Sequence, residues 1–421
     1  MNDGETLAKV FYADLWGLRS EKYEHLFQND VSTTQWQELK PVAPYYFFVP
    51  KDFALQAEYD KFWKVSEIFK KWSFGVTTSR DHFVIGFTKE EIVQRLRTFV
   101  GTLSDELVGQ ALNLKDTGTW KLSKARQKVK DLKLEEEIYP YAYRPFDNRW
   151  ICYESFLIER NRYGLMKHLL RTNIALCTNK ILAKQLFNHV FASEFVGDNT
   201  YVSNITKERT YFFPVYLYPE TPSEAIHELP LRKHSKSEYQ PNFTSEFLQT
   251  MESSISTETT PEEIFYYIYA VLYSPTYRER YQEFLKIDFP RIPLPTDKKS
   301  FTSLSKLGKE LVDLHLLRHA ALDEHGIGFP ISGSDTVEKV RYDEKTKRVY
   351  FNKDQCFEGI SKEVWEYRIG AYQVMEKYLK DRKGRRLLLD EINHYMRVAK
   401  AIRMTIQLQE RIDAIYRGMH V

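Results

Sequence analysis

The polar segment at residues 221–260 constrains the fold most, because it separates two stretches whose hydrophobic patterns differ. This segment is rich in Ser, Thr, Glu and His. Before it, short apolar runs alternate with turn residues, whereas after it apolar residues recur at helical spacing. We therefore expect a domain boundary here.

The expected fold class is α+β, with a mixed domain of short strands and helices followed by a helix-rich domain that carries a β-hairpin. A chain of 421 residues is long enough for two or three domains, each with its own core. We expect four segments: 1–24, the edge of or a linker from a preceding domain; 25–220, an α+β domain; 221–260, a polar linker; and 261–421, a helix-rich domain.

Local signals predict several elements. The apolar runs at 9–13 and 45–49 are typical of strands, and residues 53–70 resemble a helix. Thr88 followed by Glu91 predicts a capped helix start. Thr260-Pro261-Glu262-Glu263 combines a capping Thr, a Pro at the first helical position and a Glu three residues after the cap.

Further along the chain, the pattern predicts one hairpin and two more helices. Val340 and Tyr342 alternate with charged residues, and Val349 and Phe351 repeat this pattern after a polar turn. Helices are expected at about 361–381 and 390–417, where apolar residues keep helical spacing.

Composition excludes several classes of protein. The 61 Lys and Arg nearly balance the 58 Asp and Glu, so total charge does not indicate nucleic-acid binding and only local clustering can. The three Cys residues are far apart and form no C-x-x-C motif, which argues against a disulfide framework or a zinc knuckle. The sequence has no signal-peptide pattern and no apolar run of 18 residues. We therefore expect a cytoplasmic protein that is not bound to a membrane.

Motifs for catalysis and cofactor binding are missing. The sequence has neither a G-x-x-x-x-G-K-[ST] nor a G-x-G-x-x-G loop. His315 and His319 have the spacing of a zinc-protease helix, but Leu316 stands where that motif needs Glu. We therefore expect no catalytic residue, no metal site and no cofactor in this chain.

Two segments combine Arg with hydroxyl or aromatic residues. In the turn at 77–81, Thr78 and Ser79 are suited to holding a phosphate, and Arg80 to reaching a guanine edge. Alternatively, Arg80 pairs with Asp81 or another neighbour inside the domain. In the segment 143–150, Arg144 or Arg149 is expected to be structural, as part of a buried corner with a local ion pair.

A third basic segment runs from residue 160 to residue 184. Basic residues, amides and an aromatic residue together are the mixture that contacts DNA backbone and base edges. We predict DNA contacts from Arg160, Arg162, Lys167 and Lys180. The alternative is an ordinary solvated face.

The strongest charge cluster is Lys377–Arg386, where six of ten residues are Lys or Arg. A basic helix end is favourable against the helix dipole, but this accounts for only two or three of the charges. The excess predicts salt-sensitive phosphate contacts from Lys380, Arg382, Lys383 and Arg385.

Together these segments resemble the C-terminal specificity region of type ISP and related type IIG restriction–modification enzymes. The resemblance covers nearly the whole chain. It rests on 12–19 with Lys22 and Tyr23, 75–81, 143–149, 160–168, 214–219, 264–281, 288–293 and 372–385.

The resemblance implies a module that recognises a short sequence in double-stranded DNA. In this family the module positions DNA for an adenine-N6 methyltransferase domain, which uses S-adenosylmethionine and flips its target base. The N-P-P-[YF] and F-x-G-x-G loops of such methyltransferases are absent here. The expected partners are therefore DNA and a methyltransferase domain or subunit. The alternative is a stand-alone nuclease with an unrecognised carboxylate site.

Overall fold

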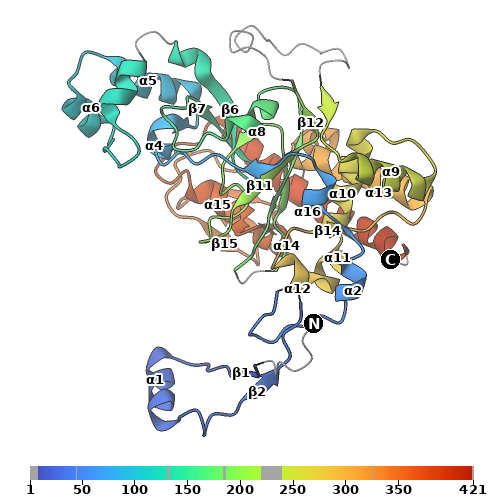
Figure 1. Ribbon diagram of the computed structural model, residues 1–421. Helices are drawn as coiled ribbons and strands as arrows, with labels where there is room; N and C mark the ends of the chain where they lie inside the picture. Colours follow the sequence, from blue (N-terminus) through green and yellow to red (C-terminus); the bar gives the residue numbers. More distant parts are fainter. Residues whose placement is uncertain are drawn as a thin grey trace. The chain divides into compact units, whose positions relative to one another are not determined.

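The computed structural model describes residues 8–43, 45–129, 133–183, 186–219, 239–324 and 326–419. The chain forms two compact units, residues 1–58 and residues 59–421, and each is described by itself. Helices and small sheets occur in both, so the chain has the expected α+β fold (Figure 1).

The first unit is a two-stranded antiparallel sheet with a helix between its strands. It consists of β1 (Val10–Tyr12), α1 (Arg19–Gln28) and β2 (Gln37–Leu39). Strand β1 confirms the strand expected at 9–13, whereas the described residues of 45–49 contain no strand. Helix α1 buries none of its side chains, and Phe27 on it is 89% exposed.

The second unit contains two four-stranded sheets. In the first, the hairpin of β6 (Ile138–Arg144) and β7 (Asp147–Cys152) is flanked by β5 (Ile85–Gly86) and by the parallel strand β10 (Val196–Gly197). The second sheet has the order β4 (Ser73–Phe74), β11 (Thr210–Pro214), β8 (Ala175–Asn179) and β9 (Val190–Ser193), with antiparallel neighbours. Strand β4 is thus an edge strand.

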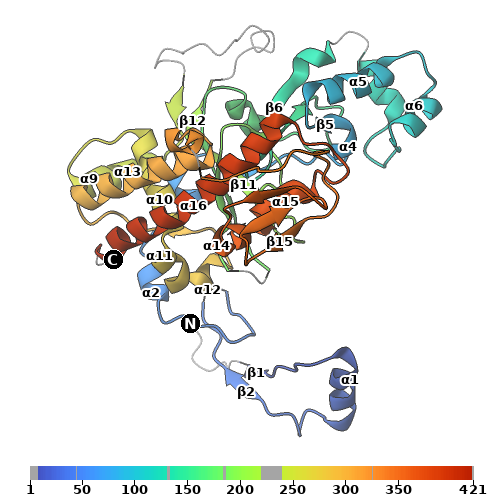
Figure 2. The same cartoon turned by 180° about the vertical axis from the view of Figure 1, so that it is seen from behind.

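Helices pack together in the C-terminal half (Figure 2). They are α9 (Ser245–Ile255), α10 (Pro261–Tyr273), α11 (Pro275–Arg280), α12 (Gln282–Leu285), α13 (Lys298–His315) and α16 (Leu389–Arg417). Helices α10 and α13 approach so closely that a Cβ on Gly308 would lie 1.9 Å from the Tyr266 carbonyl oxygen. The predicted cap of α10 is confirmed, because the Thr260 hydroxyl accepts from the Glu263 N–H at 3.2 Å.

The predicted hairpin is also confirmed and gains a third strand. Strands β15 (Arg341–Asp343), β16 (Arg348–Tyr350) and β17 (Cys356–Glu358) form one antiparallel sheet. The helix expected at 361–381 is instead two short helices separated by two strands. These elements are α14 (Lys362–Glu366), β18 (Arg368–Ile369), β19 (Tyr372–Gln373) and α15 (Val374–Lys380).

Short elements complete the second unit, and the helical arm of α4 to α7 projects from it (Figure 1). The arm contains α4 (Asp81–Val84), α5 (Lys89–Val100), α6 (Asp105–Ala111) and α7 (Leu122–Lys128). Thr88 caps α5 as predicted. The other elements are η1 (Leu134–Glu137), α8 (Tyr163–Met166), η2 (Lys167–Leu169), β12 (Tyr216–Leu217), β13 (Gln240–Pro241), β14 (Arg291–Ile292) and η5 (Ala320–Asp323).

The expectation for residues 53–70 also differs from the structure. Residues 53–70 do not form one helix but fold into α2 (Gln56–Tyr59), β3 (Trp63–Lys64) and α3 (Val65–Ile68), because β3 pairs with the distant strand β14. The expected linker 221–260 lies partly outside the described residues, but its described part contains β13 and α9. Helix α9 buries Phe247, Met251 and Ile255, and residues on both sides of this segment belong to the same compact unit.

Candidate nucleic-acid interface

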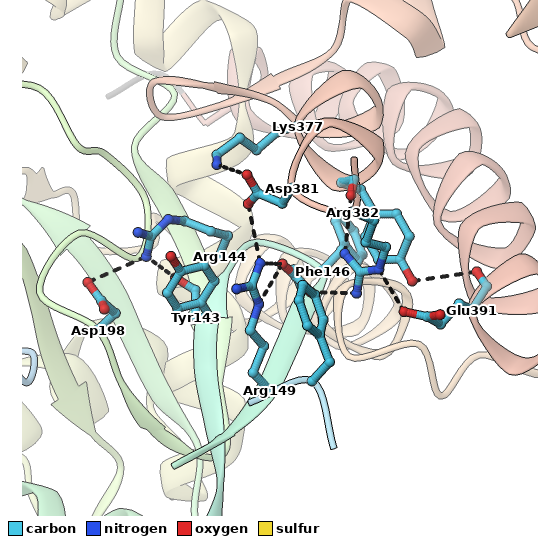
Figure 3. A network of polar contacts seen from close by, with 12 residues as sticks. Tyr143, Arg144, Phe146, Arg149, Asp198, Lys377, Asp381, Arg382 and Glu391 are labelled. Carbon is cyan, nitrogen blue, oxygen red and sulfur yellow. Dashed lines mark hydrogen bonds and ion pairs between the residues drawn. The ribbon is translucent and has the colours of Figure 1, made fainter. Parts of the chain in front are cut away.

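The start of strand β7 is held to the C-terminal segment, residues 381–391, by a buried cluster of charges (Figure 3). The Arg382 guanidinium donates to Asp147 at 2.9 Å and to Glu391 at 2.9 Å. Arg149 donates to Asp147 at 2.8 Å and to Asp381 at 3.3 Å. Burial alone would raise the pKa of Asp147, but the guanidiniums of Arg382 and Arg149 hold it well below its usual value.

The ring of Phe87 contacts the guanidinium groups of three arginines. The guanidinium carbons of Arg149, Arg382 and Arg385 lie 4.2, 4.8 and 4.0 Å from the ring centroid. Arg385 also donates to Glu91 on α5 at 2.7 Å. The cluster therefore links the helical arm, the β6–β7 hairpin and the C-terminal segment.

This placement gives Arg382 and Arg385 structural partners where the sequence predicted phosphate contacts. The side chain of Arg382 is only 5% exposed, so its guanidinium is not presented to a ligand in this structure. Arg149 forms the local ion pair with Asp147 that the sequence predicted for this corner. The other two predicted phosphate contacts, Lys380 and Lys383, are exposed. Lys380 pairs with Glu376 at 2.9 Å, and Lys383 has no side-chain partner among the described residues.

The turn at 77–81 is likewise tied inward. Arg80 is buried, donates to the Leu157 carbonyl at 3.0 Å, and stacks 4.4 Å from the Trp120 ring centroid. Glu159 lies 3.6 Å from the same guanidinium. The Thr78 hydroxyl is buried and donates to Asp81, so only Ser79 of this predicted trio is exposed. This matches the alternative considered for Arg80, with Glu159 as its partner.

The segment that pairs with this turn from a distant part of the chain begins with the exposed residue Arg160. Arg160 pairs with Thr77 through backbone hydrogen bonds of 2.9 and 3.0 Å, which fixes its position. Its side chain is exposed and has no partner among the described residues. Arg162 has a positive φ of 56°, and its guanidinium carbon lies 5.4 Å from the Phe74 ring centroid.

Phe74 belongs to an aromatic cluster at the edge of the second sheet. It stands opposite Tyr211 in the β4–β11 pair, and the two ring centroids are 4.4 Å apart. Trp72 contacts Tyr211 edge-on at 5.6 Å and Phe289 at 5.2 Å. Lys180 lies 5.6 Å from the Phe289 ring centroid and 3.7 Å from Asp288.

Cations surround this cluster, and together they define a surface that we call the aromatic–basic face. It consists of Trp72, Phe74, Arg162, Lys180 and Tyr211. The buried His168 lies in the positive field of nearby cations that include Lys71. Burial, followed by the charges of Lys167, Lys71 and Arg171, lowers the pKa of His168 to about 4.

The family model of the type ISP C-terminal specificity domain matches residues 67–411. The chain belongs to this family.

Several solved structures share this fold, and their chains are longer. A nuclease-deletion mutant of the type ISP restriction-modification enzyme LlaGI with a DNA substrate mimic has 19% identity and a TM-score of 0.67, covering 96% of this chain and 33% of that chain. The DrdV–DNA complex has 20% identity and a TM-score of 0.73, covering 96% and 43%. The ATP-dependent type ISP enzyme LlaBIII bound to DNA has 18% identity and a TM-score of 0.68, covering 93% and 27%. The specificity domain therefore spans less than half of each of these chains. None of the curated proteins matches it.

The sequence did not reveal three residues of the aromatic–basic face of this specificity domain: Trp72, Phe74 and Tyr211. The usable signal was the basic pair Lys70-Lys71 followed by aromatic residues two positions apart, which places both rings on one side of a strand. Among the described residues, no group of His, Cys, Asp and Glu is arranged to hold a metal ion, and no helix is both long and apolar enough to cross a membrane.

Proposed function

We propose that this chain is the sequence-recognition module of a restriction–modification adenine-N6 methyltransferase and that it binds double-stranded DNA through the aromatic–basic face and Arg160. Membership in the specificity-domain family supports this proposal. The single observation that carries the assignment to this face is the exposed Arg160 side chain beside Arg162 and a cation-flanked edge strand. Arg side chains are suited to base edges because they donate two parallel hydrogen bonds to guanine.

The proposed contacts fall into two groups. Arg160, Arg162 and Lys180 are proposed as base or near-base contacts, with Ser79 and Lys167 beside them. Lys380 and Lys383 are proposed as phosphate contacts, since phosphate binding is independent of sequence and needs only an accessible cation.

Methylation itself is assigned to a partner. We propose that a methyltransferase domain or subunit binds S-adenosylmethionine and that this chain holds the DNA in register for it. No residue of this chain is proposed to contact that cofactor.

Binding to a randomised duplex pool at two salt concentrations, followed by sequencing of the retained DNA, tests the proposal. We expect an enriched motif and a steep loss of affinity with salt. Replacement of Arg160 by Ala is expected to cost about 1–3 kcal/mol and to relax the motif at one position. Replacement of Lys383 by Gln is expected to weaken all sequences alike.

Two outcomes would contradict the proposal. Unchanged affinity in both the Arg160 and the Lys383 variants would remove these residues from the interface. Nicking of DNA by the purified chain with Mg²⁺ would favour the stand-alone nuclease instead. The matched control is Arg97→Ala, because Arg97 is an exposed residue on the helical arm that pairs with Glu135 at 3.5 Å.

A further inference from the structure

Trp72 is anchored by other rings and still partly accessible. It contacts Tyr211 at 5.6 Å, Phe289 at 5.2 Å and Phe213 at 5.9 Å between ring centroids. Nevertheless, 38% of its surface is exposed. Three ring contacts fix the orientation of the indole, so a ligand that stacks on it would lose little additional side-chain freedom.

The polar atoms of Trp72 and Tyr211 also bear on the choice of ligand. Within the described part of the chain, neither the Trp72 indole N–H nor the Tyr211 hydroxyl has a hydrogen-bond partner. Buried or half-buried Trp and Tyr usually place these atoms against an acceptor or donor. Here both atoms are available to a ligand that carries polar groups on a flat ring.

Positive charge surrounds the rings on two sides. The Arg162 guanidinium lies beside Phe74, and its buried Nε has no hydrogen-bond partner among the residues that the structure describes. Lys180 lies beside Phe289, the ring on which Trp72 packs. The nearby acid Asp288 is already paired with Lys64 at 2.8 Å. The ligand chemistry that fits is therefore an aromatic ring joined to an anion.

We propose that Trp72, Tyr211 and Phe74 form a stacking platform for an unpaired nucleobase of bound DNA, with Arg162 and Lys180 as the cations beside that base. This inference rests on the proposed DNA-binding function and assigns one element of it. Aromatic rings stack on bases of any sequence because every base has a π-face, whereas bases inside an intact duplex are covered by their neighbours. The platform therefore favours DNA in which one base has left the stack.

The test compares a paired duplex with the same duplex carrying one bulged nucleotide, using the full 421-residue chain. The bulged base is 2-aminopurine, whose fluorescence falls when it stacks. We expect tighter binding of the bulged duplex and quenching of its fluorescence. Trp72→Ala should remove about 5- to 150-fold of affinity for the bulged duplex, with a smaller effect on the paired duplex. Trp72→Phe should keep most of the preference, because a ring remains.

Trp365→Ala is the matched control, since Trp365 is half-buried and stacks on Tyr342 at 5.2 Å in another part of the unit. It should leave the preference for the bulged duplex unchanged. If wild-type protein binds both duplexes equally and leaves 2-aminopurine unquenched, the platform is overturned, and this result does not require a stable Trp72 variant.

A further experiment distinguishes failure of this inference from failure of the proposed function. If wild-type protein binds no duplex, the duplex-recognition function fails, and a single-stranded oligothymidine then tests the platform directly. Binding of that strand that is lost in Trp72→Ala and kept in Trp72→Phe would support the platform alone. No binding of the strand would overturn the platform as well.

Discussion

Replacing Arg382 by Met distinguishes a structural guanidinium from one that contacts DNA. The change removes the positive charge but keeps an unbranched side chain. Asp147 and Arg382 are 3% and 5% exposed in their side chains, so the substitution breaks a buried pair. Removing one partner of such a pair costs about 3–5 kcal/mol, because the other charge remains buried.

Two features of the cluster determine where the expected loss of stability falls between about 3 and 5 kcal/mol. Asp147 keeps Arg149 as a partner at 2.8 Å, which moderates the loss. Glu391 loses its 2.9 Å partner, and the guanidinium no longer covers the Phe87 ring. We therefore expect destabilisation near the lower end, about 3 kcal/mol in the free energy of unfolding.

Chemical denaturation followed by tryptophan fluorescence measures this loss, with Lys380→Met as the control. Lys380 is exposed, so its substitution is expected to change stability by less than about 0.5 kcal/mol. The second measurement is the salt dependence of DNA binding, in which each lost phosphate contact lowers the slope by about 0.9. Arg382→Met should keep the wild-type slope while the protein remains folded. Wild-type stability combined with a reduced slope would refute the structural role.

Three further predictions concern protonation, packing and charge. The pKa of His168 is lowered from 6.5 to about 4. Between these two pH values the folded state binds fewer protons than the unfolded state, so the free energy of unfolding decreases as the pH falls. His168→Gln should reduce this slope by up to about 1.4 kcal/mol per pH unit, as measured by denaturation from pH 6.5 to pH 4.5. Gly308→Ala should force α10 and α13 apart and cost at least about 1–3 kcal/mol, which a thermal melt would detect and an unchanged midpoint would contradict. Lys71→Gln should raise the pKa of His168 in an NMR titration, and an unchanged titration would remove Lys71 from the positive field.

The sequence predicted elements whose signals are local. The cap at Thr260 was predictable because its donor and acceptor lie three residues apart. The long helix α16 was predictable because its apolar spacing persists over many turns. By contrast, residues 53–70 read as a helix, although the pairing of β3 with the distant β14 decides their conformation.

The exposure of a candidate side chain was predictable from the sequence only where no distant residue pairs with it. The composition of its segment predicts DNA contact from Arg160, and its side chain is exposed. The same reasoning predicts DNA contact from Arg382, but its partner Asp147 lies 235 residues away in sequence, and composition does not reveal that pairing. Tyr211 was missed for a similar reason, since its link to Phe74 is a cross-strand contact between distant segments.

The long-range charge pairs also define which piece of the gene can be exchanged between relatives. A crossover inside the segment 221–260 would combine Asp147 from one parent with Arg382 and Glu391 from another. It would also separate Tyr273, whose hydroxyl donates to the Val190 carbonyl at 2.7 Å, from the strand it supports. Chimaeras that alter target specificity should therefore transfer residues 59–421 as one block, with recombination points placed before Tyr59.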